Sequence, residues 1–450
     1  MRADAVAGTA TGARATLAQL ADELVEHDAD LVSTDPLDWP GYDAQLTRAR
    51  ERSGELESVV SAEGRVGATR AVLVAFDFAF MGGSMSEAGG LKIANAFRRA
   101  AAAGLPVVSL HSSGGCRMQE GMKALVQMQR IAAANQVLAA AGVPHVAILM
   151  GPTTGGAWAS IAAGADVILA VPEATAAFAG HRVREGGAKA TIQDTVESGQ
   201  VDLVVPREEL ALTLATLLGL LVGRVGTGSC DLPPADVPTA LGESDLPSDG
   251  WDAVQRARSP HRSRAEAYLD AYFDVRVPLG GDRAGGHDPG MLCGFGRRAG
   301  GPIAYVARTG GANTPAGFRT AARIVRLADR LGIPILTLID TPGAANDDAA
   351  EGAAIGPSIA EAFAAVAAAR VPVTSLVIGE GGSGGALALA SHTELWIAPD
   401  AYFAVIGPES AAAILKLPPD EVPVVAERMR LRPQDLVALG VVQGIAPRLT

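Results

Sequence analysis

Cysteine and aromatic residues are scarce in this chain of 450 residues. Only Cys116, Cys230 and Cys293 are present, far apart from one another, with no CxxC pair and no histidine at ligand spacing. This pattern excludes a disulfide framework and a zinc site, so we predict that the chain binds no metal. Aromatic residues make up only 4% of the chain and hydrophobic residues 48%, so alanine, valine, leucine and isoleucine must fill its cores.

The sequence also lacks a long hydrophobic run and an excess of basic residues. Residues 1–12 have no apolar core of signal-peptide length, and the most apolar run, residues 210–222, is too short to span a bilayer. The net charge of −12, from 37 basic and 49 acidic residues, disfavours nucleic acid or an anionic membrane as partner. We therefore predict a cytoplasmic protein in which an anionic small ligand needs a local basic patch.

Glycine is abundant, with 53 residues, and much of it lies in turns between apolar segments. Residues 376–390 form the most pronounced example, because an apolar run ends at Gly379, a glycine-rich bend follows, and helix formers begin at Ala386. This order predicts a strand, a tight turn and a helix start. Glycine allows positive φ angles and lets a ligand approach the main chain, so peptide N–H groups can become the functional groups.

A second copy of this pattern lies earlier in the chain. Pro144 corresponds to Pro372 and Pro106 to Pro334 at one constant offset, and each of these prolines precedes an apolar strand pattern and a glycine turn. A third anchor, which pairs Pro172 with Pro399, keeps nearly the same offset. A register held over such a distance indicates an internal duplication and two similar halves.

Strand and helix patterns alternate along both halves at the spacing of βα units, which predicts an α/β fold with parallel strands and right-handed crossovers. Residues 227–250 are rich in proline and acidic residues and are typical of a linker. We therefore predict two domains, residues 1–226 and 251–450, joined by that linker. Among individual elements of the first domain, we expect a helix over 16–26, a strand over 77–81 and a helix over 118–141.

The glycine turns could stabilise negative charge. Residues 112–120 place Gly114 and Gly115 before a helix start, where two successive N–H groups could face a carbonyl oxygen. Loss of one such donor commonly costs about 3 to 4 kcal/mol of transition-state stabilisation. A single turn of this kind is also compatible with an ordinary tight turn, but two of them in a duplicated frame favour a pair of facing oxyanion holes.

Several longer motifs resemble a known enzyme family. The first half resembles the β subunit of the bacterial acetyl-CoA carboxylase carboxyltransferase, through FMGGSM (80–85), SSGGCRMQE (112–120), PTTGG (152–156) and FAGHRV (178–183). The second half resembles its α subunit, through WDAVQRAR (251–258), LIDTPGA (338–344), IGEGGSGGA (378–386) and VIGPES (405–410). The resemblance covers most of the chain, in the order of a β subunit fused to an α subunit.

This resemblance implies two crotonase-like domains in tandem, each a ββα superhelix of the ClpP/crotonase type. It also implies transfer of a carboxyl group from N1′-carboxybiotin to the methyl carbon of acetyl-CoA, giving malonyl-CoA. Negative charge then develops on a thioester enolate and on the biotin ureido group, and both need hydrogen-bond donors. The implied partners are a separate biotin carboxyl carrier protein, a biotin carboxylase and a further copy of this chain. Coenzyme A would lie mainly on the first half, and biotin on the second half of the partner copy.

From the residues and the resemblance together we assign two oxyanion holes. The first takes Gly114, Gly115 and Cys116, and the second takes Gly381, Gly382, Gly384 and Gly385. The predicted substrate-binding residues are Gly82, Gly83, Arg117, Gly155, Gly156, Arg182 and Gly343. Arg182 and Arg184 could contact the phosphates of coenzyme A, and Arg117 could instead pair with Glu120 and orient the turn.

The chain departs from the family pattern in places, and two alternative functions stay open. No cysteine precedes Cys116, so we expect the zinc ribbon that often begins the β subunit to be absent, and the segments after Val183 and around residues 308–315 are short. One alternative is another crotonase-type CoA enzyme, such as a hydratase, a hydrolase or a biotin-free decarboxylase, which would need Glu120, Glu380 or Glu409 as acid or base. The other is a non-catalytic subunit of a carboxylase complex.

Overall fold

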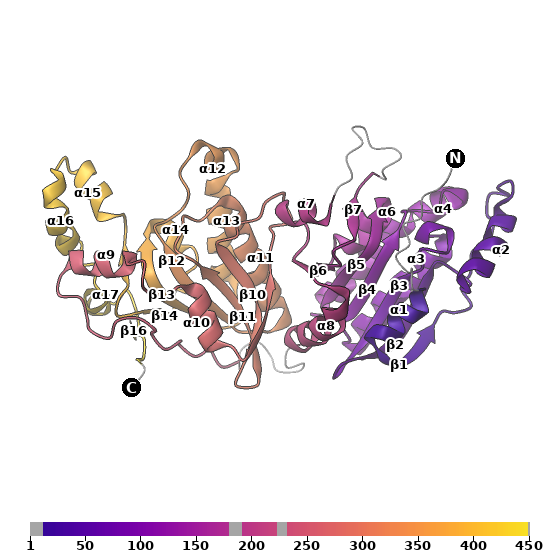
Figure 1. The fold of residues 1–450 in the computed structure, drawn as a ribbon, viewed down its shortest axis with the longest axis horizontal. Coiled ribbons are helices and arrows are strands. Elements are labelled where there is room, and N and C mark those ends of the chain that lie inside the picture. The colour runs from indigo at the N-terminus through magenta and orange to yellow at the C-terminus, as the bar shows by residue number, and fades with distance from the viewer. Residues whose placement is uncertain (1–11, 180–190, 223–231, 449–450) are drawn as a thin grey trace. The chain divides into compact units, whose positions relative to one another are not determined.

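The computed structural model describes residues 12–179, 191–222 and 232–448. The chain divides into two compact units (Figure 1), the first extending to residue 222 without residues 197–199, and the second taking those three residues and everything from residue 223 onwards. No helix within the described ranges is both long enough and apolar enough to cross a membrane.

The first unit is built on one mixed sheet. Its strand order is β1-β2-β3-β4-β5-β6-β8, with β7 beside the end of β5. The strands β1, β2 and β3 pair antiparallel, and all pairs from β3 onwards are parallel. The strand bounds are β1 Asp22–His27, β2 Val59–Val66, β3 Thr69–Phe76, β4 Val107–Ser113, β5 His145–Thr154, β6 Val167–Ala170, β7 Thr175–Ala177 and β8 Leu203–Val204.

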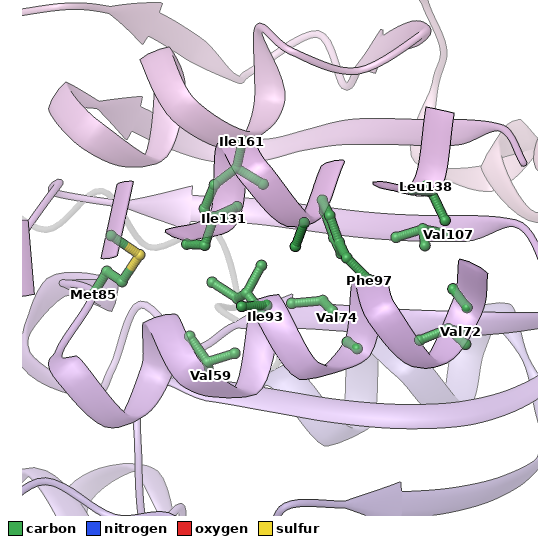
Figure 2. Packing of buried hydrophobic residues seen from close by; sticks show 14 of the residues in the cluster. Val59, Val72, Val74, Met85, Ile93, Phe97, Val107, Ile131, Leu138 and Ile161 are labelled. Carbon is green, nitrogen blue, oxygen red and sulfur yellow. The ribbon is translucent and has the colours of Figure 1, made fainter. Parts of the chain in front are cut away.

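Helices α3 and α5 cover one face of this sheet, because their apolar stripes face the inward side chains of the strands. Figure 2 shows Ile93 and Phe97 of α3 beside Ile131 of α5 and Val74 of β3, all fully buried. The described α-helices of this unit are α1 Ala13–Leu20, α2 Tyr42–Ser53, α3 Glu87–Ala103, α4 Gly121–Leu125, α5 Gln127–Ala140, α6 Gly155–Ala157, α7 Ile192–Glu197 and α8 Arg207–Leu221. Two short 3-10 helices, η1 Met81–Gly83 and η2 Met118–Glu120, and one π-helix, η3 Trp158–Ala162, accompany them.

The second unit repeats the first strand for strand. Its order is β9-β10-β11-β12-β13-β14-β16, with β15 beside the end of β13. The strand bounds are β9 Val275–Leu279, β10 Met291–Arg298, β11 Gly301–Arg308, β12 Ile335–Thr341, β13 Val373–Gly382, β14 Leu395–Ile397, β15 Tyr402–Ala404 and β16 Gly444–Ile445. The described helices are α9 Gly250–Arg258, α10 Ala265–Tyr272, α11 Pro315–Leu331, α12 Asp348–Gly352, α13 Ile355–Ala368, α14 Ser383–Leu387, α15 Pro408–Ile414, α16 Val422–Arg428 and α17 Pro433–Ala438, with the turn η5 Pro419–Glu421.

Equivalent helices of the two units begin with the same kind of N-terminal cap, which confirms the duplication. Ser86 begins α3 by accepting the Gly89 N–H at 2.8 Å, and Thr314 begins α11 by accepting the Gly317 N–H at 3.1 Å. A side-chain oxygen at this position satisfies an N–H group that has no partner within the helix. Strands β12 and β13 have the same lengths as β4 and β5 and follow them at the offset that separates the paired prolines. The two units therefore share one backbone plan.

Several expected elements differ from the structure. The helix expected over 16–26 ends at Leu20, and Asp22–His27 is strand β1, because the free edge of β2 offers hydrogen-bond partners to an extended segment. The strand expected over 77–81 is a turn, held by Asp77, whose carboxylate accepts the Ala79 N–H at 2.8 Å. The helix expected over 118–141 is broken into η2, α4 and α5.

The sheets and the expected linker also differ in part from the prediction. The first three strands of each unit are antiparallel, so the sheets are mixed rather than wholly parallel. The described part of the expected linker lies against the second unit, since the Ala235 carbonyl accepts the hydroxyl of Thr374 at 2.8 Å and the Ala240 N–H donates to the Pro447 carbonyl at 2.8 Å. The domain limits 1–226 and 251–450 remain predictions.

Candidate active site

The first glycine turn lies where β4 ends. Gly83 approaches it so closely that a Cβ there would overlap the Ser112 carbonyl oxygen, and both Gly82 and Gly83 have positive φ angles, of +66° and +65°. The Gly114 N–H donates to the Gly82 carbonyl at 2.9 Å. This hydrogen bond corrects the sequence assignment of Gly114, because its N–H is already used to build the turn.

The N–H groups that follow are used differently. The Gly115 N–H donates to the Ser113 hydroxyl at 3.2 Å, and the Gly155 N–H donates to the Phe178 carbonyl at 2.9 Å. Gly156 lies in the first turn of α6, where the helix itself offers its N–H no partner. Within the described residues, neither this N–H nor that of Cys116 has another main-chain partner. These two residues face each other, since a Cβ on Gly156 would lie 2.7 Å from the Cys116 sulfur. The turn therefore presents two unused N–H groups, from Cys116 and Gly156.

The second glycine turn has the same construction. Gly343 follows β12 with φ of +135°, and its N–H donates to the Thr341 hydroxyl at 3.0 Å. A Cβ on Gly385 would overlap the Ala344 nitrogen, so these two main-chain segments touch. Gly384 and Gly385 lie in the first turn of α14, where the helix itself offers their N–H groups no partner. Neither these two N–H groups nor that of Ala344 has another main-chain partner in the described chain.

Gly381 and Gly382 lie in strand β13 and serve close packing. Gly381 pairs with both Thr341 and Phe403, and a Cβ on Gly382 would overlap the Pro342 carbonyl oxygen. Both residues thus fit the tight turn, while the unused donors follow them at Gly384 and Gly385.

The flanking hydrogen bonds show how closely the two turns correspond. On either side of Cys116, the Met85 N–H donates to the Gly115 carbonyl and the Arg117 N–H donates to the Met85 carbonyl, each at 2.8 Å. Asn313 does the same around Ala344, through Gly343 at 2.9 Å and Ala345 at 2.8 Å. Ala344 was missed by sequence reasoning, although it is the counterpart of Cys116 at the offset of the repeat, which could have identified it.

Arg117 is a correction to the predicted substrate-binding set. Its side chain is 0% exposed and forms an ion pair with the equally buried Glu57 at 2.6 Å. Burial alone would raise the pKa of Glu57, but the charge and hydrogen bonds of Arg117 outweigh it and hold that pKa below its usual value. The remaining donors of the guanidinium are occupied by Ser33, Tyr42, Ser58 and Ser84. Arg117 therefore supports the turn from behind and has no contact left for a substrate.

The three carboxylates that could act as acid or base are also occupied. Glu120 is buried and accepts the Tyr42 hydroxyl at 2.6 Å and the Glu87 N–H at 2.6 Å. Glu380 accepts the Tyr402 hydroxyl at 2.7 Å and pairs with Arg258 at 3.0 Å. Glu409 pairs with the same arginine at 2.5 Å.

Titratable side chains in the core of the first unit are equally unsuited to proton transfer. His111 and His145 share the Ser109 hydroxyl at 2.7 Å each, and burial lowers the pKa of each histidine to about 3. Both are therefore neutral at pH 7. Burial also raises the pKa of the Cys116 thiol, which disfavours a thiolate nucleophile beside the first turn.

A cavity of about 790 Å³ opens beside the first turn. Helix α2 contributes Arg48 and Arg52 to its lining, and the first turn and its neighbours contribute Cys116, Ser84 and Met81. The other lining residues are Gln45, Ala49, Glu51, Met118 and Gln119. Arg52 donates to the Ala79 carbonyl, while Arg48 is exposed and has no hydrogen-bond or ion-pair partner in the described chain. The lining holds two arginines and one glutamate, so it carries a small excess of positive charge toward an anionic ligand.

Arg182 and Arg184 lie outside the described residues, so their predicted contacts with phosphate stay predictions. Across the ranges that the structure describes, no cluster of three or more histidine, cysteine, aspartate or glutamate side chains is arranged to hold a metal ion.

Two family models match the chain in tandem. Residues 32–227 match the carboxyl transferase domain, and residues 247–448 match the acetyl co-enzyme A carboxylase carboxyltransferase-like family. A fused acetyl-coenzyme A carboxylase carboxyl transferase subunits beta/alpha protein of Salinispora tropica is 38% identical and covers 97% of this chain and 82% of its own length. A probable biotin-dependent acyl-coenzyme A carboxylase beta3 subunit of Mycobacterium bovis is 33% identical, over 92% of this chain and 85% of its own.

Solved structures agree on the fold. The transcarboxylase 12S structure with methylmalonyl-coenzyme A bound, described as a hexamer, covers 97% of this chain and 87% of its own, with a TM-score of 0.79 at 23% identity. A single-chain, multi-domain long-chain acyl-CoA carboxylase covers 96% of this chain and 45% of its own, with a TM-score of 0.75 at 22% identity. With its two tandem crotonase-like domains, the chain therefore belongs to the biotin-dependent acyl-CoA carboxyltransferases, in the family of fused acetyl-CoA carboxylase carboxyl transferase β/α chains.

Proposed function

We propose that this chain moves a carboxyl group from carboxybiotin on a carrier protein to a short acyl-CoA, with acetyl-CoA as acceptor and malonyl-CoA as product. The observation that carries this proposal is the pair of equivalent turns, each with unused main-chain donors: Cys116 and Gly156 in one, Ala344 with Gly384 and Gly385 in the other. Two anions develop in the reaction, and each needs donors fixed in advance.

The first turn is proposed to hold the thioester carbonyl of the acyl-CoA. Negative charge would gather on that oxygen as the neighbouring carbon gives its proton to the ureido group of biotin. The N–H groups of Cys116 and Gly156 would stabilise this charge more strongly in the transition state than in the ground state. This role needs no protein acid or base near the thioester, which agrees with the occupied states of Glu120, Glu380 and Glu409. The same occupancy disfavours the hydratase and hydrolase alternatives.

The second turn is proposed to face the ureido ring of biotin. Biotin supplies a carboxyl carrier whose ring oxygen becomes more negative when the carboxyl group leaves, and a turn with unused N–H groups fits such an oxygen. Ala344, Gly384 and Gly385 would hold that oxygen and orient the ring. The carrier is a separate protein under this proposal, and a biotin carboxylase reloads it.

A second copy of the chain is proposed to complete the site. Large apolar side chains are exposed near the elements that carry both turns: Met118 (67%) and Met122 (66%) follow the first turn, and Val405 (79%) and Ile414 (70%) lie in the segments after β13. Apolar groups in this number favour coverage by another protein surface. The first turn of one copy would then meet the second turn of its partner.

The assay that tests the function is the reverse reaction. With malonyl-CoA as donor and biocytin as acceptor, the purified chain should release acetyl-CoA only when biocytin is present, and faster with a biotinylated carrier protein. Acetyl-CoA release without biocytin would identify a biotin-free decarboxylase instead. Absence of any release from malonyl-, methylmalonyl- and longer carboxyacyl-CoA, with or without the carrier, would contradict the proposal. The relative rates among these donors would define the preferred acyl chain.

The cavity beside α2 predicts how coenzyme A is held. We expect Arg48→Glu to raise the KM for malonyl-CoA about tenfold, which corresponds to about 1.4 kcal/mol, and to leave kcat unchanged, because Arg48 would contact the phosphates in ground state and transition state alike. The N-acetylcysteamine thioester of malonate lacks these phosphates and should react equally well with both proteins.

Arg98→Glu is the matched control, because Arg98 is an exposed arginine of the same unit that is absent from the cavity lining. Equal effects of the two substitutions on malonyl-CoA would indicate a general charge effect. An increased KM for the N-acetylcysteamine thioester would indicate a disturbed turn, and either result would reject Arg48 as a phosphate contact.

A further inference from the structure

We propose that Asn313 positions the second glycine turn, and that this is the reason for a polar side chain at this place. The inference rests on the function proposed above for that turn. Asn313 lies just before α11 and is 0% exposed. Its main chain and its side chain contact the two different segments that supply the unused N–H groups.

The main chain of Asn313 fixes the Ala344 segment. The Asn313 N–H donates to the Gly343 carbonyl at 2.9 Å, and the Ala345 N–H donates to the Asn313 carbonyl at 2.8 Å. The residue between these two bonds is Ala344, so its N–H is held at a set place with its direction fixed from both sides. Met85 holds Cys116 in the same way in the first unit.

The side chain of Asn313 adds a contact that its counterpart in the first unit cannot make. Its amide nitrogen donates to the Gly385 carbonyl at 3.0 Å. Asn313 therefore joins the Ala344 segment to the turn that begins α14. A methionine at the equivalent position, Met85, has no amide to make such a bond, and its side chain packs in the apolar core of the first unit.

The other end of the Asn313 amide argues against a purely structural role. Its oxygen is buried and has no hydrogen-bond partner within the described residues. Burial of an unpaired carbonyl oxygen lowers stability, and this cost offsets part of what the hydrogen bond to Gly385 contributes to the fold. Stability alone therefore gives little reason for an asparagine at this position. We infer that the residue serves to hold the geometry of the turn.

The test replaces Asn313 by methionine, the residue at the equivalent position of the first unit. We expect Asn313→Met to lower kcat/KM for biocytin about 10- to 100-fold, because a turn that is loose by a fraction of an ångström loses transition-state contacts. The KM for malonyl-CoA and the thermal unfolding midpoint should stay close to those of the unmodified chain. Hydrogen exchange of the amides in residues 383–388 should become faster.

Thr374→Val provides the matched control. The Thr374 hydroxyl also donates to a carbonyl, that of Ala235, and Thr374 lies on β13 at the end opposite the glycine turn. This variant should leave biocytin kinetics and exchange in residues 383–388 unchanged. Asn313→Asp gives a second readout, because a protonated carboxyl group can donate to Gly385 and a carboxylate cannot. Its activity should therefore recover as the pH falls, relative to the unmodified chain.

The outcomes separate this inference from the function on which it rests. Full biocytin activity in Asn313→Met, or an equal loss in Thr374→Val, would overturn the positioning role. A fall in the unfolding midpoint in step with activity would also overturn it, since that result indicates a structural role. If the unmodified chain has no carboxyltransferase activity, the proposed function fails. Unchanged hydrogen exchange of residues 383–388 in Asn313→Met would separately reject the role of the Asn313 side chain in holding this turn.

Discussion

Gly385→Ala is expected to lower kcat for biocytin-dependent release of acetyl-CoA by about 10² to 10³-fold, the loss typical of a missing oxyanion donor. The added methyl group would overlap the Ala344 nitrogen, so Ala344 and the turn at Gly385 cannot both keep their places. The fold should survive, because the overlap is confined to one turn. Steady-state kinetics together with circular dichroism and thermal unfolding would measure both effects.

Gly356→Ala serves as the control for this substitution. It also places a methyl group near the start of a helix of the second unit, α13, but apart from the adjoining residues and backbone of its own helix no described atom lies within 4 Å of that position. It should keep full activity. A Gly385→Ala protein with activity close to that of Gly356→Ala would show that the second turn does not act on the reacting group.

Gly385→Ala can also show whether the two turns of one site come from one copy of the chain or from two. Gly115→Ala should inactivate the first turn, since Gly115 has φ of +101°, a conformation that side chains disfavour. If each site combines turns from two copies, chains with the two different substitutions, expressed together, should regain activity, because one of the two sites in a mixed pair then has both turns intact. If both turns of a site come from one chain, the mixture should stay inactive.

Arg117→Met is expected to lower the free energy of unfolding by about 3 to 5 kcal/mol, because it leaves the buried Glu57 carboxylate without its cation. Urea unfolding at pH 7 would measure this loss. The lowered pKa of Glu57 means that its pair with Arg117 stabilises the native chain above the ordinary glutamate pKa of 4.5 and loses this effect as the pH falls. The stability difference between the two proteins should therefore shrink below that pH.

The double variant Arg117→Met with Glu57→Gln checks the cause. It removes both charges, so it should recover part of the stability lost in Arg117→Met alone. If Glu57→Gln lowers the free energy of unfolding as much in the Arg117→Met protein as in the unmodified chain, the two substitutions act independently. That result would contradict the buried ion pair as the source of the effect. A small loss in Arg117→Met itself would indicate that Glu57 finds another partner.

The repeated fold could be predicted because the marks of the repeat are backbone requirements. A proline before each strand and glycines after it report where the chain must turn, and such constraints are visible in one sequence. Strand β1 could not be predicted in this way. Asp22–His27 is mostly polar and none of its residues is buried, and it becomes a strand through pairing with β2, a contact distant in sequence.

The sequence predicted the region of the site, but not which main-chain N–H groups are free to act as donors there. The glycines indicated both turns, yet which N–H groups are free depends on bonds such as Gly114 to Gly82, which no sequence pattern reports. Arg117 resembled a ligand contact, because the sequence does not reveal that Glu57 is buried beside it. Ala344 has no side-chain signal at all, and only its register in the repeat marks it.

The tandem order of the two units has a consequence for the cell. Under the proposed function, every complete site needs one turn from each type of unit, and a single polypeptide supplies them in equal number. Separate subunits would reach that balance only through matched expression, and an excess of either would expose apolar surface without a partner. Translation of one message thus sets the stoichiometry of the enzyme, because each copy of the chain carries one unit of each type.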